Sequence, residues 1–241
     1  MRKLLPICVV AALVAGGTAQ AAELSPIYKA PKAVVAPPSY SWTGCYVGVH
    51  VGGGWGEKHW ANTSGLDEGT SDIGGVLGGG QVGCDYQTGP WVFGGEGNVS
   101  WADLTGEHRD PVPVFNNQVL HSEVDWLATL TGRVGYAINN TLFYVKGGGA
   151  WAGDKFWDVA DGVGTIANAS ETRSGWIVGG GVEYGFAPRW SAKAEYNYLD
   201  FGTDRVTLIC PGCTAGFFNK DITQHIHIVK VGANYRFNWG P

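Results

Sequence analysis

Residues 91–101, WVFGGEGNVSW, decide the fold, because apolar side chains alternate strictly with polar or very small ones. This alternation places every second side chain on the same face of a β-strand. Ten residues of strand rise roughly 33 Å, and a tilt of about 40° leaves roughly 25 Å along the membrane normal. Outer-membrane barrels have an apolar band of about that height, flanked on both sides by aromatic girdles. The segment therefore predicts a membrane-spanning strand.

The same spacing of aromatic residues recurs along the chain. Four further segments carry aromatic residues ten or eight positions apart, with the same alternation between them. The pattern predicts two aromatic girdles, one at each membrane surface. They comprise Trp55, Trp91, Trp101, Trp126, Tyr136, Phe143, Trp151, Trp176, Phe186, Trp190, Tyr198 and Phe237.

Eight strands are predicted in total. Their approximate limits are 43–57, 74–87, 90–104, 124–138, 141–155, 174–187, 189–202 and 225–237. Tight turn signals follow the second, fourth and sixth strands, at Gln87-Thr88-Gly89-Pro90, Ile138-Asn139-Asn140 and Ala187-Pro188-Arg189. The other connections are longer and polar. This alternation indicates an all-β fold, an eight-stranded antiparallel up-and-down transmembrane β-barrel with both termini in the periplasm.

The two faces of the strands differ in polarity. One face carries mainly valines together with all the girdle aromatics, and the other carries charged residues interspersed with glycine. A soluble lipocalin-like barrel would turn the apolar face inward. The aromatic pairs at both strand ends and the secretory signal favour an apolar face turned outward to lipid. The predicted lumen charge network is then Asp85, Glu96, Asp125, Arg133, Lys146, Glu183, Lys193, Glu195, Lys230 and Arg236.

The region before the barrel divides into two parts. Residues 1–21 combine a positive start at Arg2 and Lys3, an apolar middle and a small-residue cleavage site, which is typical of a signal peptide. Residues 22–41 are rich in proline and lack periodicity, which predicts an extended periplasmic segment. The barrel itself is predicted over residues 42–241.

Composition and charge exclude several classes of protein. Charged residues make up 15% of the chain, below the roughly 25% of average soluble domains. Removal of Arg2 and Lys3 leaves 14 basic and 21 acidic residues, a net charge of −7, so a nucleic-acid-binding surface is not expected. Ten acidic residues are expected in loops: Asp67, Glu68, Asp72, Asp103, Glu107, Asp110, Asp158, Asp161, Glu171 and Asp204.

Four cysteines remain after the signal peptide, an even number in an oxidising compartment. Cys45 and Cys84 fall on adjacent predicted strands, near one barrel end and on one face. The two cysteines could form a cross-strand disulfide or remain unpaired. Cys210 and Cys213 form a CxxC pair in a loop. Its surroundings do not resemble a thioredoxin fold, so a loop staple is favoured over a redox site.

Several segments resemble a known family. They include TGCYVGVHVGGGWG from residue 43, WLATLTGRVGYAINNTLFYVKGGGAW from residue 126 and GWIVGGGVEYGFAPRWSAKAEYNYLDFG from residue 175. These segments are similar to small outer-membrane proteins of alphaproteobacteria, the RopB-like branch of the opacity-protein and OmpA-like superfamily, often labelled porin family. The resemblance implies a barrel in the bacterial outer membrane that contributes to envelope integrity and surface interactions. It implies no catalytic residues.

The resemblance also suggests partners. Outer-membrane lipids and lipopolysaccharide surround such a barrel. The final strand ends Tyr-Arg-Phe at Phe237, which resembles the terminal signature read by the barrel-assembly machinery. The resemblance specifies no surface ligand or host partner, and no cofactor is expected.

The predicted lumen and loops are compatible with three classes of function. Eight strands enclose a space just wide enough for side chains to fill, so an ion-paired plug is favoured over a low-conductance porin. The loops could bind haem or another ligand or contact a host, and His225 and His227 share a strand face and could ligate a metal. His121, Ser122 and Glu123 are adjacent, so their side chains point to opposite faces and do not form a catalytic triad.

Overall fold

A computed structural model describes residues 40–62, 67–109, 118–160, 164–209 and 217–237. Its strands are β1 (Gly44–Asn62), β2 (Asp67–Thr88), β3 (Trp91–Arg109), β4 (Gln118–Ile138), β5 (Thr141–Ala160), β6 (Gly164–Ala187), β7 (Trp190–Ile209) and β8 (Phe217–Phe237). No helix long and apolar enough to cross a membrane occurs in these ranges. The predicted signal peptide, residues 22–39 and the Cys210–Cys213 pair lie outside the described residues.

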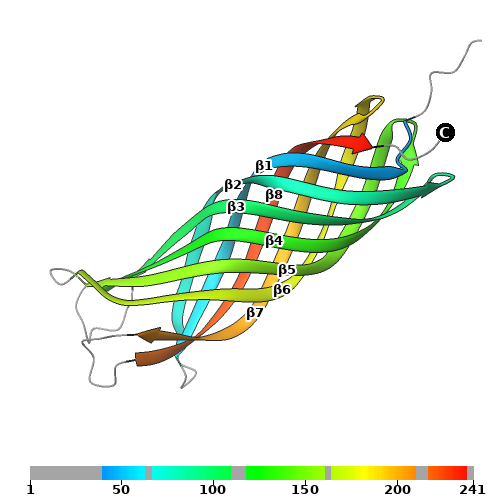
Figure 1. Cartoon of the computed structure of the whole chain (residues 1–241). Coiled ribbons are helices and arrows are strands. Elements are labelled where there is room, and N and C mark those ends of the chain that lie inside the picture. Colours follow the sequence, from blue (N-terminus) through cyan, green and yellow to red (C-terminus); the bar gives the residue numbers. More distant parts are fainter. Residues whose placement is uncertain (1–39, 63–66, 110–117, 161–163, 210–216, 238–241) are drawn as a thin grey trace, which may run out of the picture. The chain divides into compact units, whose positions relative to one another are not determined.

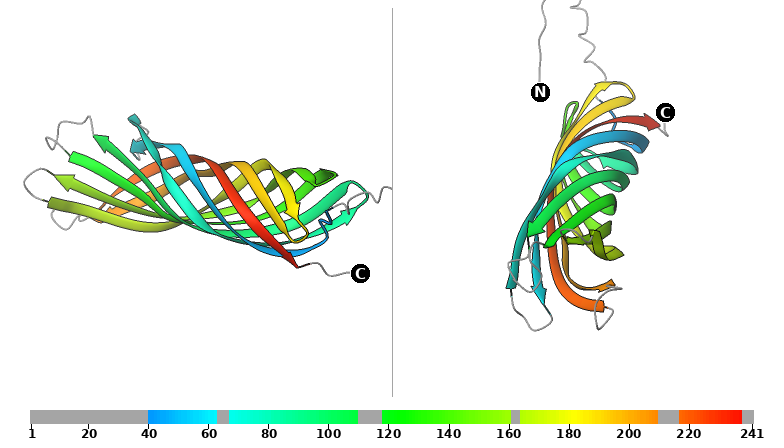
Figure 2. Two further views of the ribbon diagram at one scale, coloured as in Figure 1. Left: turned by 90° about the horizontal axis from the view of Figure 1, so that it is seen from above. Right: turned by 90° about the vertical axis from the view of Figure 1, so that its left-hand side faces the viewer.

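The strands form one closed antiparallel barrel (Figures 1 and 2). Each strand pairs with the next, and β8 returns to pair with β1. Tight turns join β2 to β3, β4 to β5 and β6 to β7 at the predicted positions. Gly89 and Asn139 adopt positive φ angles of 58° and 54° in two of these turns, which glycine and asparagine tolerate best. The predicted eight-stranded up-and-down barrel is confirmed.

Both ends of the described chain lie at the end of the barrel that carries the tight turns. The backbone N–H of Tyr40 donates to Asn140 Oδ1 in the β4–β5 turn, at 3.2 Å. The backbone N–H of Arg236 donates to the carbonyl of Arg189 in the β6–β7 turn, at 2.8 Å. The opposite end, where the longer connections occur, is called the loop end below.

The strands extend further toward the loop end than predicted. β2 begins at Asp67 rather than at residue 74, and β4 at Gln118 rather than at residue 124. Loss of the apolar alternation marked the end of the apolar band and not the end of the strand, because ladder hydrogen bonds join backbones whatever the side chains. Eight acidic residues expected in loops lie on strands, Asp103 within the predicted limits 90–104 and the others on the extensions: Asp67, Glu68, Asp72, Asp103, Glu107, Asp158, Glu171 and Asp204. Asp110 and Asp161 lie outside the described residues.

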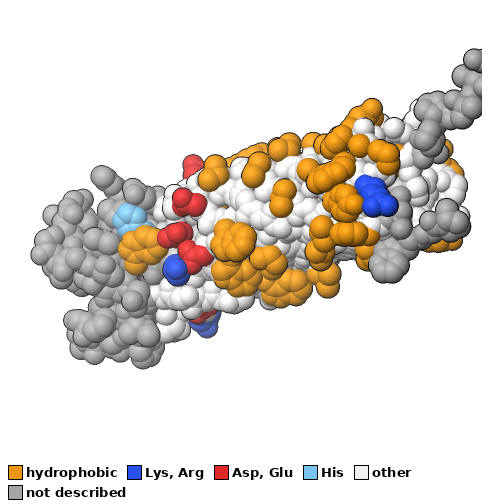
Figure 3. Space-filling model, turned by 45° about the horizontal axis from the view of Figure 1, so that its top comes forward, with side chains coloured by type: hydrophobic (Ala, Val, Ile, Leu, Met, Phe, Trp, Pro, Cys, Tyr) orange, Lys and Arg blue, Asp and Glu red, His pale blue; other side chains and the backbone are white. Residues whose placement is uncertain are grey.

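The outer surface of the barrel is apolar. Val49, Val99 and Val145 are 66%, 55% and 60% exposed, in line with the predicted outward parity. Figure 3 shows hydrophobic side chains spread over the barrel wall, with acidic and basic side chains gathered mainly toward one end. A soluble protein rarely exposes so continuous an apolar surface, whereas a lipid-facing barrel requires one.

The lumen contains two apolar layers. Twelve buried apolar side chains, here called the apolar belt, fill its loop-end half: Ile73, Leu77, Leu104, Val124, Leu127, Ala150, Ala152, Ile177, Leu199, Phe201, Ile226 and Ile228. At the tight-turn end, Tyr40 and Trp42 pack inside the barrel against Val92, Leu142 and Tyr144. The barrel interior thus includes the side chains of Tyr40 and Trp42, at and just before the predicted start of the barrel domain.

The ladder between β6 and β7 is interrupted near the loop end. Trp176 pairs with Asp200, and the next pair toward the loop end is Asn168 with Ile209. Across this interval the guanidinium of Arg173 donates to the carbonyl oxygens of Gly202, at 3.4 Å, and Ile222, at 2.6 Å. A buried arginine side chain therefore bridges the wall where backbone hydrogen bonds are missing.

A disulfide ties β1 to β2. Cys45 and Cys84 are direct cross-strand partners with their Cα atoms 3.9 Å apart, and the structure joins their sulfur atoms. Cys45 also lies opposite Phe237, at the seam where β8 closes the barrel on β1. A covalent link here restricts the unfolded chain and holds the first strand in register beside the closing seam.

Candidate functional site

The tight-turn half of the lumen holds a buried charge network. Nine of the ten predicted lumen residues belong to it, and every one is less than a tenth exposed. They come from seven strands: Asp85 (β2), Glu96 (β3), Arg133 (β4), Lys146 (β5), Glu183 (β6), Lys193 and Glu195 (β7), and Lys230 and Arg236 (β8). On each strand these residues occupy inward-facing positions, and the common tilt of the strands brings their side chains to neighbouring levels of the barrel.

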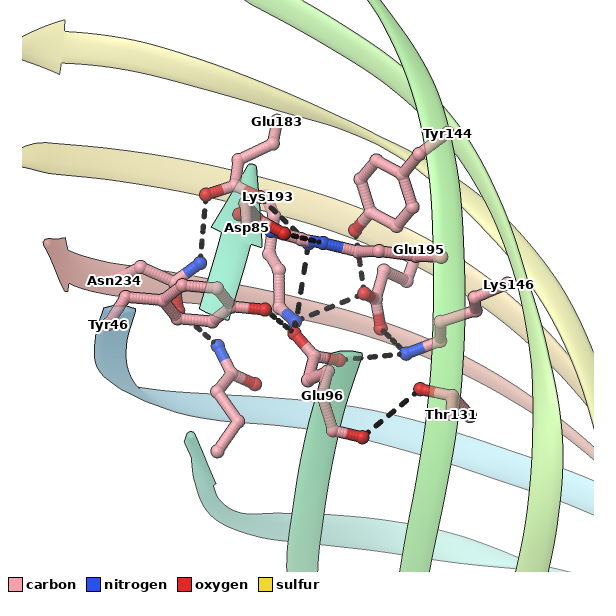
Figure 4. A network of polar contacts seen from close by, with 12 residues as sticks. Tyr46, Asp85, Glu96, Thr131, Tyr144, Lys146, Glu183, Lys193, Glu195 and Asn234 are labelled. Carbon is pink, nitrogen blue, oxygen red and sulfur yellow. Dashed lines mark hydrogen bonds and ion pairs between the residues drawn. The ribbon is translucent and has the colours of Figure 1, made fainter. Parts of the chain in front are cut away.

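Glu96 lies at the centre of the network (Figure 4). Its Oε2 accepts hydrogen bonds from Tyr46 Oη at 2.8 Å and Lys193 Nζ at 2.6 Å. Its Oε1 accepts from Lys146 Nζ at 3.0 Å and from Asn98 Nδ2 at 3.1 Å. One carboxylate thus binds side chains from three other strands inside the lumen.

A second group centres on two arginines. Arg133 binds Asp85 through two parallel bonds, Nε to Oδ1 at 2.8 Å and Nη2 to Oδ2 at 2.6 Å. Arg236 Nη1 donates to the same Oδ2 at 2.8 Å. The Arg133 guanidinium also lies 4.9 Å from the ring centroid of Tyr46 and 5.0 Å from that of Tyr144. Bidentate pairs of this kind fix orientation as well as charge.

The network is nearly neutral. Its four carboxylates face five cationic side chains, which are interlinked rather than solvated. Lys230, for example, lies 3.1 Å from Glu195 Oε2 and donates to Asn98 Oδ1 at 2.9 Å. Pairing of this density is required because isolated charge in a lumen without bulk water is very costly.

Asp125, the tenth predicted member, does not belong to the network, and that prediction is wrong. A β-bulge between Val124 and Trp126 inserts an extra residue and reverses the parity of β4 beyond it. Val124 is therefore buried, while Asp125 pairs with the exposed Lys155 at 2.7 Å. Burial and the Asp125 carboxylate raise the pKa of nearby Glu123, outside the apolar band.

The apolar belt is not among the features predicted from the sequence. Its members Leu77, Ile177 and Leu199 share the inward parity of Asp85, Glu183 and Glu195 on the same strands. Extending the parity assignment toward the loop end would have found them. The belt meets the charge network at a cavity of about 20 Å³, which is room for roughly one water molecule.

A smaller polar layer lies beyond the belt. Lys58 Nζ contacts Asp154 Oδ1 at 3.3 Å, and Arg173 Nη1 donates to Gln224 Oε1 at 3.0 Å; all four side chains are buried. Burial lowers the pKa of Lys58, and the Asp154 carboxylate partly offsets that effect. From the tight turns outward, the described lumen therefore runs aromatic, charged, apolar and polar.

All twelve girdle aromatics lie on the outer face. Ten of them are exposed, and Trp126 and Tyr198 are half-buried. Cross-strand contacts fix several, such as Trp91 with Tyr136 at 5.3 Å between ring centroids. These positions agree with two aromatic girdles, one at each membrane surface.

The histidines considered for ligand binding have other partners. His227 accepts or donates a 2.7 Å bond with Tyr196 Oη and stacks on Trp55, and His225 stacks on Tyr198. Among the described residues, no group of three or more potential metal-ligating side chains occurs. His121 stacks on Trp157, while the neighbouring Ser122 is buried in the lumen, so the two do not converge.

A closed eight-stranded ring with a lipid-facing apolar band, aromatic girdles and a charged lumen defines a small outer-membrane β-barrel protein. The chain belongs to the family described as outer membrane protein beta-barrel domain, whose model matches residues 8–237. The predicted family relationship and outer-membrane location are confirmed at this level.

Relatives and solved structures agree with this assignment. The chain is 29% identical over 234 residues to the 31 kDa outer-membrane immunogenic protein of Brucella melitensis biotype 1, covering 91% of this chain and 94% of that protein. It is 28% identical to the 25 kDa outer-membrane immunogenic protein of Brucella abortus biovar 1, covering 86% and 84%. Its fold is similar to OprG of Pseudomonas aeruginosa, with a TM-score of 0.52 at 8% identity, covering 82% and 99%.

Proposed function

We propose that this protein is a surface-exposed outer-membrane barrel whose lumen is closed to ions, and that it contributes to envelope integrity through its lipid-facing wall. The single observation that carries the proposal is the stacking of the apolar belt on the charge network inside one narrow lumen. The proposed function includes no chemical reaction.

The two layers oppose conduction for different physical reasons. An ion crossing the apolar belt would lose its hydration without gaining polar partners, which is strongly unfavourable. An ion crossing the charge network would have to displace paired side chains such as Arg133 and Asp85, which already satisfy one another. A small porin is the alternative that this arrangement disfavours.

The proposed orientation places the tight turns and both termini in the periplasm and the loop end outside. Short periplasmic turns and longer outer connections are the usual arrangement of such barrels. The names of the Brucella relatives, which describe them as immunogenic, are in keeping with a surface that antibodies reach. Phospholipid, lipopolysaccharide and the barrel-assembly machinery are the proposed partners.

Planar-bilayer recording tests the closed lumen. We expect refolded protein to give no stable single-channel steps, because the belt and the network both exclude hydrated ions. Glu96→Gln and Arg133→Gln variants that still fold serve as comparison. Stable steps in the natural protein, with an ion selectivity that these two substitutions change, would replace the closed barrel with a porin.

Cysteine labelling of intact cells tests the orientation. In a Cys210→Ser/Cys213→Ser background, we expect a membrane-impermeant maleimide to label Arg205→Cys, on the exposed loop end of β7. The same reagent should not label Asn139→Cys in the β4–β5 turn until the cells are lysed. Labelling of Asn139→Cys alone in intact cells would reverse the orientation and leave the closed lumen unaffected.

A further inference from the structure

An apolar groove runs along the lipid-facing wall over β6, β7, β8 and β1. Its volume is about 490 Å³. Two cross-strand rows form it, Val51, Val231, Ala194 and Val182 in one and Val49, Ala233, Ala192 and Tyr184 in the other. Small alanines form the floor and larger side chains the walls. The groove is continuous with the apolar band, so a lipid acyl chain can reach it directly.

The same four strands carry a row of stacked rings at the loop-end girdle. Trp55 stacks on His227 at 5.7 Å between centroids, His227 contacts Tyr198 at 5.1 Å, and Tyr198 contacts Trp176 at 5.5 Å. Tyr196 holds the His227 ring by its Nδ1. Trp55 and Trp176 remain about half exposed, at 51% and 49%, so the row presents fixed aromatic faces and a polar edge to the membrane interface.

Groove and ring row are aligned along the strands. On their own strands, Trp55, His227 and Tyr198 lie four positions from Val51, Val231 and Ala194 of the first groove row. Four positions correspond to roughly 13 Å along a strand and about 10 Å along the membrane normal. The intervening row runs Gly53, Val229, Tyr196 and Gly180, so the path between the two features is low on β1, beside Trp55, and on β6. A headgroup at the rings would thus place its acyl chain in the groove.

The polar end of the ligand must determine its identity. Inside a bilayer, any acyl chain leaves one apolar environment for another, so the groove selects shape only. Beyond the ring row, His225 lies opposite both Glu57 and Asp200. These carboxylates can accept hydrogen bonds from the hydroxyl and amide groups that an acylated aminosugar carries. Aromatic faces in turn stack on the C–H faces of sugar rings.

We propose that this face binds one acylated aminosugar lipid of the lipid A class, with a sugar ring against Trp55 and His227 and an acyl chain in the groove. The assignment rests on the proposed orientation, which puts the ring row in the outer leaflet.

The remaining part of the wall, which adjoins the groove at Val49, supplies a matched control. A second hollow, of about 820 Å³, lies over β1 to β5, with Ala128 in its lining and Trp101 and Trp151 beside it. Its rim aromatics are tryptophans, without the His227–Tyr196 pair. Its shape is therefore suited to acyl chains, whereas its polar edge lacks the proposed sugar contacts.

Native mass spectrometry of the refolded chain tests the site. The detergent is an octyl tetraethylene glycol ether, which carries no sugar, and the titrants are purified lipid A and phosphatidylglycerol. We expect one retained lipid A per chain and no comparable retention of phosphatidylglycerol. Ala194→Phe and Trp55→Ala should each weaken lipid A binding about tenfold, whereas Ala128→Phe and Trp101→Ala should leave it within about twofold.

Three results would overturn the proposal: no retained lipid A, equal retention of phosphatidylglycerol, or equal losses in the two matched pairs. Folding of every variant is verified by its heat-dependent gel mobility. Failure of the lipid site with Arg205→Cys still labelled on intact cells leaves the orientation standing. Lipid A retention with the reverse labelling pattern would instead overturn the orientation alone.

Discussion

Replacing Glu96 with alanine is expected to destabilise the folded barrel by about 3–5 kcal/mol, the range for breaking a buried ion pair from one side. The substitution removes the carboxylate that Lys146 and Lys193 share, at 3.0 and 2.6 Å, and the acceptor of the Tyr46 hydroxyl. Two buried ammonium groups would then lose a counter-charge in a lumen that offers no bulk water. Urea titration of the protein in phospholipid vesicles, followed by gel mobility, measures the change.

Two comparisons make this result specific to the network. Glu57→Ala, on the exposed outer face, should change stability by less than about 0.5 kcal/mol. Adding Lys193→Met to Glu96→Ala should cost less than the sum of the single changes, because the second substitution removes one of the two lysines that have lost Glu96 and share only Glu195. A Glu96→Ala protein as stable as Glu57→Ala would show that the lumen is hydrated and that its charges act independently.

Replacing Gly79 with alanine is expected to cost about 3 kcal/mol or more, at or above the upper end of ordinary overpacking. A Cβ atom at Gly79 would clash with the carbonyl oxygen of Val99 and lie 2.7 Å from the Cα of Ser100 on β3. Both neighbours are backbone atoms of a paired strand, so neither can move without disrupting the ladder. The yield of heat-modifiable protein after refolding, and its urea midpoint, report the loss.

Gly80 provides the control within the same glycine run. A Cβ atom there would point outward and lie 3.7 Å from the carbonyl oxygen of Gly48, an ordinary contact. Gly80→Ala should therefore be neutral or stabilise the barrel by about 0.4–1 kcal/mol, through lower entropy of the unfolded chain. Equal effects of the two substitutions would contradict the inward position of Gly79.

Much of the architecture follows from local patterns in the chain. Strict alternation in segments such as 91–101 identified the strands and the outward parity of Val99, and the turn residues located the three tight turns. These features depend on a few consecutive residues, so one strand carries all the information needed. The alternation along each strand also predicts the inward position of nine charged side chains, without reference to strand pairing.

Asp125 shows where a local sequence pattern fails to predict the direction of a side chain. Asp125 follows the alternation of its own segment, yet the bulge at Val124–Trp126 turns it outward to Lys155. A bulge depends on how β4 fits between β3 and β5, and the sequence of β4 alone carries no mark of it. The loop-end extensions of the strands were missed for a similar reason, because backbone pairing continues where side-chain periodicity stops.

Alternation along single strands is thus sufficient for strand number, facing and the lipid-exposed band. The choice of partners inside the lumen depends on the closed ring. Arg236 meets Asp85 although 151 residues separate them, and Lys193 meets Glu96 across 97 residues. Closure of β8 on β1 sets those distances, because strand tilt and the diameter of the ring decide which inward side chains reach one another. The apolar belt and the Arg173 bridge arise from the same geometry.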